Sequence, residues 1–451
     1  MSVGLLSYAS YLPRYRLSGD DIGLRRGDRV IASYDEDSTT MAVAAAMVAV
    51  PQGATPAAVY FVTSTPAYAD KTNATAVHAA LGLPATVFAA DMCGTARSAF
   101  AAVTAAAKHG GLAVAADVRV GRPGSADEKL GGDGAAALLF GEGDPIAEYV
   151  ASYSVTEEFL DRWRDPQAAA GAQWEERFGY ERYAPLIRAA AEGALSAAGV
   201  GDADHVVLAC PNTAVLKRAA TLVKGQKSVV TSPVGFSGSS DALVGLCGVL
   251  DIAQPADTIL VLSATDGCDA VVLKATDRLP EARQRVPLSD QRADGTVLPY
   301  VTYLSSRNLV EMEPPRRPEP DRAAAPPAAR GRSWKFGFSG SCCRACGFVH
   351  LPPVQVCRAC GSSDEMSAAP AAYLSGTVVT YTVDRLAFSP SPPMVQVVID
   401  VDGGGRCTLE LADAQSAELG VGTRVSFAFR RLFTVGGIHD YFWKAVQTRG
   451  Q

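Results

Sequence analysis

Short apolar runs alternate with helix-like segments through the first part of the chain. The run at 58–65 predicts a buried strand, and the residues at 73–83 predict a helix. A second apolar run at 85–90 predicts a strand that leads into Cys93, and the alanine-rich segment 94–108 after it predicts a buried helix. Two further apolar runs, at 112–118 and 134–140, predict the last strands of this unit.

The same order of elements recurs after Gly201. In this second copy the turn at 235–239 falls where Cys93 falls in the first copy. Two copies of one strand, helix, strand, turn, helix, strand, strand unit predict a duplicated, five-layered α/β body in which both turns meet at the centre. An ordinary doubly wound fold also alternates short strands with helices, and the duplication is what distinguishes the two.

A segment rich in proline, alanine and arginine separates this body from the rest of the chain. Six prolines lie between residues 313 and 332. This composition disfavours helix and strand and favours an extended spacer. Beyond it, alternating apolar residues and glycine-rich turns predict a small closed β-barrel. Its five expected strands lie at 376–385, 394–401, 406–411, 424–433 and 440–447.

Two Cys-x-x-Cys pairs, Cys343 with Cys346 and Cys357 with Cys360, are separated by ten residues. This spacing is typical of four thiolates that hold one tetrahedral ion, and we expect that ion to be Zn²⁺. Four thiolates leave no open coordination position, so the zinc is expected to be structural. A redox dithiol would not need two matched pairs, and iron is the alternative ion. Cys342 is expected to be a bystander because the paired spacing is complete without it.

Length and composition exclude several classes of protein. The chain has 451 residues, 48% hydrophobic and 20% charged, which is typical of a folded protein with more than one domain. The net charge of −6 argues against a nucleic-acid-binding surface along the whole chain. The sequence has no run that is apolar enough for a membrane span and no signal-peptide pattern. Six of the ten cysteines are scattered, so we expect a cytoplasmic protein that binds neither membranes nor nucleic acid.

Cys93 lies at the junction between an expected strand and an expected helix. At such a turn the first free N–H groups of the helix favour a thiolate and can hold an oxyanion. This position is typical of a nucleophile. The alternative is a small buried apolar residue, because free cysteine is among the most buried residue types.

Several separated motifs in residues 1–310 carry a family resemblance. They are the opening 3–17, the Cys93 turn, Gly132-Asp-Gly-Ala-Ala-Ala137, the stretch 154–163, Pro211-Asn212 and the turn 236–240. Together they resemble the thiolase superfamily, and most closely its hydroxymethylglutaryl-CoA synthase-like (beta-ketoacyl synthase III-like) branch. The remainder resembles a rubredoxin-like zinc ribbon joined to an OB-fold, a module that accompanies acyl-CoA-handling thiolase-like proteins. We therefore expect a thiolase-like domain at 1–310, a linker at 311–333, a zinc ribbon at 334–367 and an OB-fold domain at 368–451.

The resemblance implies a mechanism in which a cysteine takes an acyl group from a CoA or carrier-protein (phosphopantetheine) thioester and passes it on. Cys93 matches the nucleophile position, and the backbone of Ser239 matches the second oxyanion donor. The resemblance also implies a homodimer. Asn212 and the basic residues Lys217 and Arg218 are our candidates for contacts with CoA, although a solvated helix start explains the two basic residues at least as well.

Three departures from the family pattern argue against authentic hydroxymethylglutaryl-CoA synthesis. The chain has Ala209-Cys-Pro-Asn212 where the family has His before Gln-Pro-Asn, and Val234 falls where the family has an asparagine. Ser64 falls about where the synthases carry an acid/base glutamate. None of the five histidines lies close enough in sequence to replace the missing one, and His205 is expected to face solvent. A Claisen condensation would then lack both its base and the donors that stabilise an enolate.

Three functions fit this pattern, and we rank them in order. The first is an acyltransferase of specialised metabolism in which Cys93 is acylated and a partner or the acceptor supplies the base. The second is a non-catalytic scaffold that holds acyl-CoA for a partner enzyme. The third is a thioester aldolase-type activity in which tyrosine or aspartate groups near the turn act as acid and base. Fold analogy alone does not decide among them.

The barrel has an alternative ligand of its own, because such barrels often bind single-stranded nucleic acid through basic grooves and stacking aromatic residues. We expect strand alternation to bury half of the aromatic residues, and fusion to a thioester-handling body favours acyl-CoA. The residues concerned are Phe427, Phe429, Arg430, Arg431, Tyr441, Phe442 and Trp443.

Overall fold

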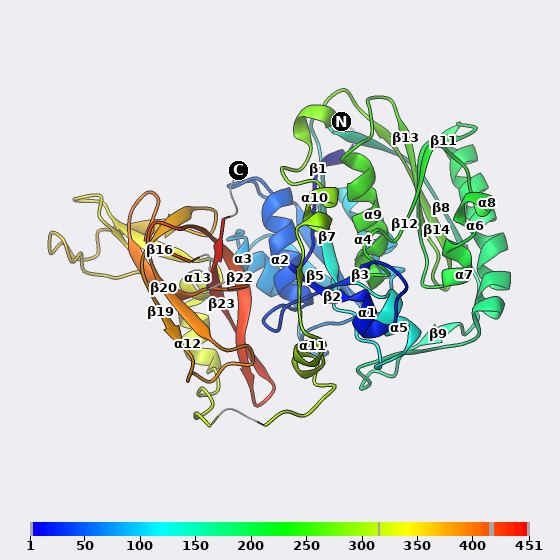
Figure 1. Cartoon of the computed structure of the whole chain (residues 1–451). Coiled ribbons are helices and arrows are strands. Elements are labelled where there is room, and N and C mark those ends of the chain that lie inside the picture. The colour runs from blue at the N-terminus through cyan, green and yellow to red at the C-terminus, as the bar shows by residue number, and fades with distance from the viewer. Residues whose placement is uncertain (1–2, 314–315, 415–418, 449–451) are drawn as a thin grey trace. The chain divides into compact units, whose positions relative to one another are not determined.

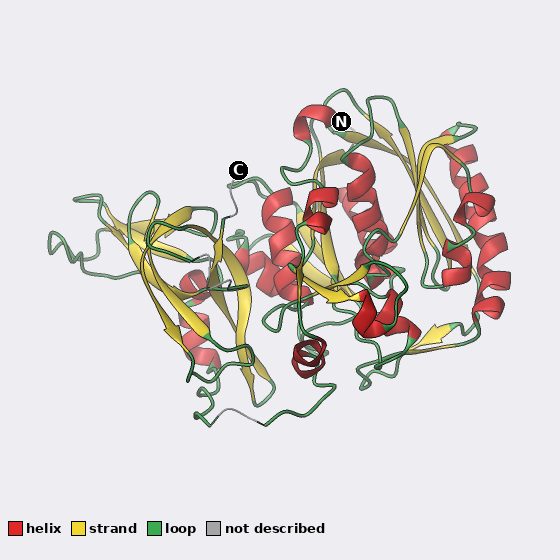
Figure 2. Cartoon of the chain, viewed as in Figure 1, coloured by secondary structure: helices red, strands yellow, loops and turns green. Residues whose placement is uncertain are grey.

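The computed structural model describes residues 3–313, 316–414 and 419–448, and the chain divides into two units (Figure 1). The first unit comprises Met1–Ala32, Asp37–Thr75 and Pro84–Tyr303. The second comprises Ser33–Glu36, Ala76–Leu83 and Leu304–Gln451. Helices and strands alternate in the first unit, whereas strands dominate the second (Figure 2).

The first unit is built from two halves with the same strand order. In the first half the order is β1-β7-β6-β4-β5, and in the second it is β8-β14-β13-β11-β12. Counted along the chain, both read first, fifth, fourth, second, third strand, which confirms the predicted duplication. The pairing of Leu5 with Ala147 joins the two sheets. The ten strands are β1 (Gly4–Tyr11), β4 (Ala58–Thr63), β5 (Phe88–Cys93), β6 (Gly111–Asp117), β7 (Gly134–Gly141), β8 (Ala147–Thr156), β11 (Ala203–Ala209), β12 (Gly225–Thr231), β13 (Thr258–Ser263) and β14 (Gly267–Ala275).

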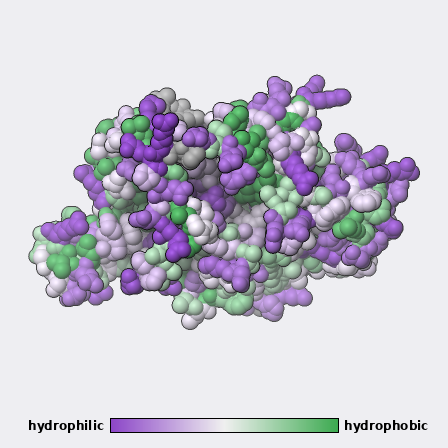
Figure 3. All heavy atoms as spheres, turned by 90° about the horizontal axis from the view of Figure 1, so that it is seen from below, coloured by the Kyte–Doolittle hydropathy of each residue, from purple (hydrophilic) through white to green (hydrophobic). Residues whose placement is uncertain are grey.

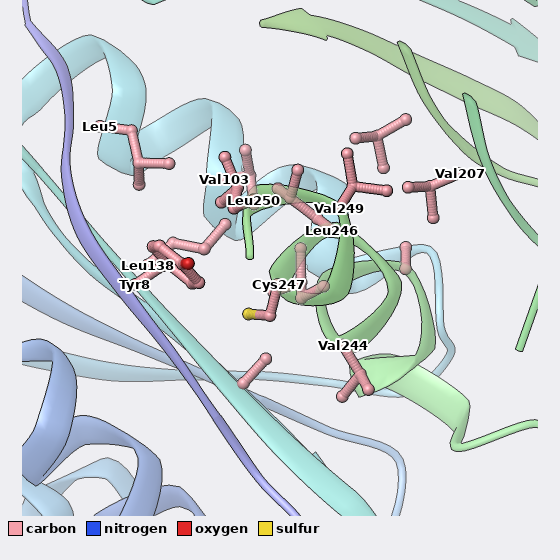
Figure 4. Packing of buried hydrophobic residues seen from close by; sticks show 14 of the residues in the cluster. Leu5, Tyr8, Val103, Leu138, Val207, Val244, Leu246, Cys247, Val249 and Leu250 are labelled. Atoms are coloured by element: carbon pink, nitrogen blue, oxygen red, sulfur yellow. The ribbon is translucent and has the colours of Figure 1, made fainter. Parts of the chain in front are cut away.

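Helices form three layers around the two sheets. Helix α2 (Ser38–Ala49) packs on β1, β6 and β7, and α6 (Glu176–Ala198) packs on β8 and β14. Helices α4 (Ser98–His109) and α9 (Asp241–Leu250) lie at the centre, and α9 contacts strands of both halves. Nearly every residue of α9 is buried, as expected of a helix covered on all sides. Figure 4 shows its side chains packed against Val103 of α4 and Leu138 of β7.

Helix α4 begins later than the sequence predicts. The expected start was residue 94, but the helix starts at Ser98. The φ angle of Gly94 is +128°, which lies outside the helical region. The preceding strand β5 likewise ends at Cys93 instead of residue 90. Cys93 is therefore the last residue of a strand and is separated from the helix by a four-residue loop, 94–97, which we call the Cys93 loop.

Shorter elements complete the first unit and its connections. They are β2 (Tyr15–Ser18), α1 (Gly19–Ile22), β3 (Asp28–Ile31), α3 (Ala74–Ala80), α5 (Ala126–Leu130), β9 (Arg162–Trp163), β10 (Ala172–Gln173), α7 (Thr213–Leu216), α8 (Ala219–Leu222), η1 (Gly238–Ser240), η2 (Leu279–Ala282), α10 (Leu288–Ala293), β15 (Thr296–Val297) and α11 (Tyr300–Ser306).

The second unit contains a small ribbon and a five-stranded barrel. The ribbon strands have the order β17-β16-β18, and the barrel strands have the order β21-β20-β19-β22-β23. A bridge between Leu411 and Ala445 joins the first and last barrel strands, so the barrel closes as predicted. These strands are β16 (Ser339–Cys343), β17 (Val349–His350), β18 (Met366–Pro370), β19 (Ser375–Asp384), β20 (Met394–Val401), β21 (Arg406–Glu410), β22 (Arg424–Val435) and β23 (Ile438–Gln447).

The proline-rich segment differs from the expected extended spacer. It contains two short helices, α12 (Ala325–Arg330) and α13 (Arg332–Lys335). Pro326 and Pro327 lie in the first turn of α12, where a missing N–H and a fixed φ angle do not interfere with the helix. The prediction that these prolines disfavour a helix was therefore wrong for Pro326 and Pro327, because both lie in the first turn of α12.

Hydrophilic residues are spread over the face of the molecule seen in Figure 3, with smaller hydrophobic areas among them. Among the described residues, no helix has the length and apolar character needed to cross a membrane.

Candidate functional site

The carboxyl ends of three parallel strands form the centre of the site. Strand β4 pairs in parallel with β5 on one side and β6 on the other. Thr63, at the end of β4, is the register partner of Cys93 at the end of β5. Asp117 ends β6. In open α/β sheets ligands bind beyond the carboxyl ends of strands, so the topology brings Cys93 to the edge where a ligand is expected.

Asp117 organises the polar groups beside Cys93. Its carboxylate is fully buried and accepts six hydrogen bonds from four residues. The amide and the hydroxyl of Ser64 each donate to it over 2.7 Å. Thr63 and Thr65 supply three more donors. Burying a carboxylate is costly unless its oxygens accept hydrogen bonds, and here both oxygens do.

The sixth donor is the amide of Ser239, which lies 2.7 Å from Asp117 Oδ2. We expected this amide to hold an oxyanion, but in this structure it is already engaged by a carboxylate. The backbone explains the contact. Gly238 has a φ angle of +64°, and a Cβ there would lie 2.1 Å from Asp117 Oδ2. Only glycine lets the turn approach Asp117 this closely.

The thiol of Cys93 is solvent-exposed, and its pKa is raised above the ordinary 9.0. Partial desolvation is the main cause, and the negative charges of Asp91 and Asp117 add to it. This direction is opposite to the one expected from a helix N-terminus, because the Cys93 loop separates the sulfur from α4. At neutral pH the group is a thiol and needs a base before it can attack a carbonyl.

A cavity of about 310 Å³ opens beside the Cys93 loop. Three arginines and one aspartate are the charged groups that line it. The pKa of that aspartate, Asp266, is raised, mainly by burial. The lining residues are Ser64, Gly94, Thr95, Ala96, Arg119, Arg162, Trp163, Arg164, Gly171, Tyr183, Pro211, Phe236, Gly238, Thr265 and Asp266.

Arg97 fixes the Cys93 loop to the second half of the unit. Its guanidinium makes two hydrogen bonds to Asp269 on β14, at 2.9 and 3.0 Å. It also donates to Thr156 Oγ1 at 2.7 Å and to the carbonyl of Asp266 at 2.6 Å. A planar guanidinium with a bidentate carboxylate partner has a defined orientation. The loop that follows Cys93, which belongs to the first half, is therefore anchored to residues of the second half.

The predicted CoA contacts are not among the residues that line this cavity, although Pro211, next to Asn212, is. Asn212 is buried and caps α7, and its side-chain amide donates to the carbonyl of Glu176 at 3.0 Å. Lys217 and Arg218 are exposed, and the Arg218 guanidinium lies 4.8 Å from the ring centre of Tyr180. None of the three predicted residues lines the cavity. Their role in binding CoA stays a prediction.

The residues at the departures from the family pattern are mostly structural. Cys210 is fully buried, and burial raises the pKa of its thiol. Val234 is buried, and Ser64 is held by Asp117. His205 does not face solvent as we expected, because its ring lies 2.8 Å from Ser228 Oγ and 3.0 Å from Asp257 Oδ2 and is buried.

The sequence analysis did not identify Asp117, Arg97 or Asp266. An aspartate at the end of an apolar strand was a usable signal, because the carboxyl ends of parallel strands share one edge. The pairing of Arg97 with Asp269 spans 172 residues, so no local pattern could indicate it. The arginines around the cavity come from two separate segments, the loop after β6 and the region of β9, and neither segment has a periodic signal.

The four cysteines of the ribbon lie together as predicted. Their sulfur atoms are all within 4.8 Å of one another. Cys343 and Cys360 are 3.7 Å apart, and Cys346 and Cys357 are 3.6 Å apart. Zn–S bonds of about 2.3 Å in a tetrahedron place sulfur atoms about 3.8 Å apart, so the arrangement fits Zn²⁺. Cys342 is outside this group.

The aromatic residues of the barrel are mostly packed inside it. Phe427, Phe429, Tyr441 and Trp443 are buried, and so is Arg430. Buried rings cannot stack on successive bases, which removes much of the basis for the nucleic-acid alternative.

Comparison with known proteins places both parts of the chain. Residues 337–366 match the family model "ChsH2, rubredoxin-like zinc ribbon domain", and residues 371–430 match "ChsH2, C-terminal OB-fold domain". The chain is 31% identical over 345 residues to a hydroxymethylglutaryl-CoA synthase of Archaeoglobus fulgidus, covering 68% of this chain and 99% of that protein. It is 32% identical over 338 residues to a hydroxymethylglutaryl-CoA synthase of Methanopyrus kandleri, covering 67% of this chain and 95% of that protein.

Solved structures share the fold. A structure of HMG-CoA synthase complexed with CoA has a TM-score of 0.58 at 17% identity and covers 67% of this chain and 89% of that chain. The 3-oxoacyl-(acyl carrier protein) synthase III, FabH, of Pseudomonas aeruginosa PAO1 has a TM-score of 0.53 at 20% identity and covers 61% of this chain and 98% of that chain. The first unit is therefore a thiolase-like fold.

Proposed function

Because the chain belongs to the hydroxymethylglutaryl-CoA synthase family, we propose that it is an acyltransferase that forms an acyl-enzyme on Cys93. The donor is a CoA or carrier-protein thioester, as the CoA complex and the acetyl donor-ACP complex of structural neighbours suggest. The observation that carries the proposal is the position of Cys93. An exposed thiol ends the strand whose following loop lines a cavity.

The proposed transfer has two steps, acylation of Cys93 and transfer of the acyl group to an acceptor. A base removes the proton of the Cys93 thiol, and the sulfur attacks the thioester carbonyl carbon. The new Sγ–C bond forms while the bond from that carbon to the donor sulfur breaks, and the donor thiolate takes up a proton. A nucleophile of the acceptor then attacks the same carbon and loses its proton, and the Cys93 sulfur leaves and is protonated again.

Asp266 is the proposed proton acceptor for the first step. It lines the cavity that the Cys93 loop borders. Burial raises the pKa of its carboxyl group, which makes the carboxylate a stronger base than an ordinary aspartate. Asp266 takes the place of the histidine that the chain lacks for removal of the thiol proton. Ser64, Ala209 and Val234 stand where the family has the groups that a Claisen condensation needs, which is why we propose transfer to an acceptor instead of hydroxymethylglutaryl-CoA synthesis.

A second function, a non-catalytic acyl-CoA scaffold, is favoured by one specific observation. The Ser239 amide donates to Asp117, so an oxyanion at that position would have to compete with a carboxylate. In the scaffold the thioester stays intact, and a partner enzyme carries out the chemistry.

Intact-protein mass spectrometry separates the two functions. The full chain is incubated with a panel of acyl-CoAs and acyl-carrier proteins, beside the Cys93→Ala variant. An adduct of acyl mass on the wild type but not on the variant supports the transferase. Absence of an adduct with every donor, together with binding of acyl-CoA, supports the scaffold.

The proposed assembly is a homodimer formed through β5. Among the described strands, β5 pairs only with β4 and is the edge of the sheet, and Phe88 on it is 61% exposed. An exposed edge strand with a large apolar residue is a template for pairing with another strand. Light scattering that gives a monomer mass at micromolar concentration contradicts this assembly.

The ribbon zinc has a structural role in this proposal. Cys343, Cys346, Cys357 and Cys360 would hold the ion, and four thiolates leave it no position for a substrate. Its contribution is to cross-link a small segment that has little core of its own.

A further inference from the structure

Three arginines, Arg119, Arg162 and Arg164, line the 310 Å³ cavity together with one aspartate. Within the described residues, Arg162 is the arginine of this cavity that forms an ion pair, with Asp127. Arg164 donates to the carbonyl groups of Ala168 and Ser64. Arg119 donates to the Ser64 hydroxyl at 3.3 Å. Two guanidinium groups thus use neutral acceptors and keep donors for a ligand.

Two of the arginines, Arg119 and Arg162, contact the same aromatic ring, that of Phe236. The guanidinium carbon of Arg119 lies 5.5 Å from the ring centre of Phe236, and that of Arg162 lies 5.9 Å from the same ring. Such contacts orient a cation without neutralising it. The pKa of Arg162 is lowered, mainly by burial and also by the neighbouring positive charge of Arg119. Two cations close together in a partly buried site are stabilised by an anion between them.

Hydrogen bonds connect Arg119, through the Ser64 hydroxyl, to Asp117 at the end of β6. The Ser64 hydroxyl that it contacts lies 2.7 Å from Asp117 Oδ2, and the charge of Asp117 acts on the thiol of Cys93. The loop residues Gly94–Ala96 form another wall of the same cavity. An anion bound by Arg119 therefore lies close to an acyl group on Cys93.

We propose, on the basis of the proposed acyl-enzyme, that Arg119 and Arg164 bind a carboxylate at the far end of the acyl group, so that the substrate is a dicarboxylic acyl thioester. The phosphates of CoA are a whole pantetheine arm away from the thioester sulfur, which places them outside a cavity beside Cys93. The Cys93 loop and the arginines line the same cavity, so a short acyl chain on Cys93 with a terminal carboxylate would extend into the space that they share. Arginine binds such a carboxylate through two parallel hydrogen bonds.

Asp266 also faces the cavity and opposes an anion there. The groups that line the cavity are three arginines and this one aspartate, and Arg162 is paired with Asp127. Asp161 and Asp241 act on Arg162 and Arg119 from outside the lining. The Arg97 guanidinium donates to the backbone carbonyl of Asp266. Arg97 therefore balances part of the charge of Asp266 from outside the cavity.

Paired acyl-CoAs of equal chain length test the substrate class. The first measurement is calorimetric binding of glutaryl-CoA and pentanoyl-CoA to the full-length Cys93→Ala variant, which cannot form an adduct. A charge-assisted bidentate contact predicts that glutaryl-CoA binds about tenfold tighter or more. Additional Arg119→Met or Arg164→Met substitution should reduce that ratio toward one. Arg177→Met, at an exposed position on α6, is the matched control and should keep it.

The second measurement is the rate of adduct formation on the chain with intact Cys93, using the same two donors. Faster acylation by glutaryl-CoA supports the inference. Equal binding and equal rates for the two donors overturn it and leave the proposed acyltransferase intact. Preferential binding of glutaryl-CoA without any adduct supports the carboxylate site and contradicts the acyltransferase. If Arg119→Met does not fold, Arg164→Met provides the test, because that exposed side chain contacts only backbone carbonyls.

Discussion

Replacing Asp117 by asparagine tests whether this carboxylate holds the site together. The substitution keeps the shape of the side chain but exchanges one oxygen for an NH₂ group. If the nitrogen takes the place of Oδ2, the Ser64 hydroxyl can rotate and accept a hydrogen bond, but the Ser239 amide is left facing another donor. If the nitrogen takes the place of Oδ1, the Ser64 amide faces another donor, whereas the Thr65 amide keeps Thr63 Oγ1 as an acceptor. Both orientations leave a buried donor without a partner.

The magnitude follows from the number of donors. An orphaned buried donor costs about 1–3 kcal/mol, and hydrogen bonds to a charged group are worth about 1 kcal/mol more than neutral ones. With one donor orphaned and four bonds made neutral, Asp117→Asn should lower the free energy of unfolding of the first unit by about 5–7 kcal/mol. The loss of a negative charge should also bring the pKa of Cys93 back toward its ordinary value.

Hydrogen exchange and urea unfolding provide the assay. Amide exchange of peptides that span β4 and β6 reports on this unit alone, and urea unfolding followed by circular dichroism gives the midpoint. Asp202→Asn, at an exposed position, is the matched control. Equal midpoints and equal exchange for the two variants would refute the assignment of Asp117 as the residue that organises the site.

Three further predictions concern the thiol, the Cys93 loop and the ribbon. Because the pKa of Cys93 is raised above 9.0, its alkylation by iodoacetamide should still increase between pH 8 and pH 9, and a plateau below pH 8 would contradict this. Arg97→Met removes the bidentate contact to Asp269, so it should slow Cys93 acylation and destabilise the first unit by about 2–4 kcal/mol in urea; no change in either quantity would argue against the fixing role. Metal analysis should find one zinc per chain, which a Cys346→Ser variant loses and a Cys342→Ser variant keeps; equal zinc in both variants would contradict the ligand set.

Much of the fold could be predicted because the order of apolar and polar residues in most elements follows the side that is buried. The strand predicted at 394–401 coincides with β20. Every second residue of this strand is buried in the barrel and is apolar, which is the pattern that predicts a strand. The duplicated half was also predictable, because the same order of elements occurs twice. Helix boundaries were less accurate. A backbone turn at Gly94 delays α4, and composition alone does not show a φ angle of +128°.

The site was predicted less well than the fold because its contacts join distant parts of the chain. Cys93 was found because its neighbours in sequence form a recognisable turn. The raised pKa of its thiol was not, since it depends on partial burial in the folded chain and on the charges of Asp91 and Asp117, the latter from another strand. The Ser239 amide was expected to hold an oxyanion because the family resemblance placed it at the second donor position, but its partner Asp117 is 122 residues away. His205 was assigned to the surface by its place at the start of a strand, and its partners Ser228 and Asp257 come from neighbouring segments of the fold.

The contact between Arg97, at the end of the Cys93 loop, and Asp269 links the two repeats. A chimera that exchanges one repeat for that of a relative would separate the guanidinium from its carboxylate, and the Cys93 loop would lose its anchor even though each repeat kept its own hydrophobic core. Recombination between members of this family should therefore preserve substrate turnover only where both residues are inherited together.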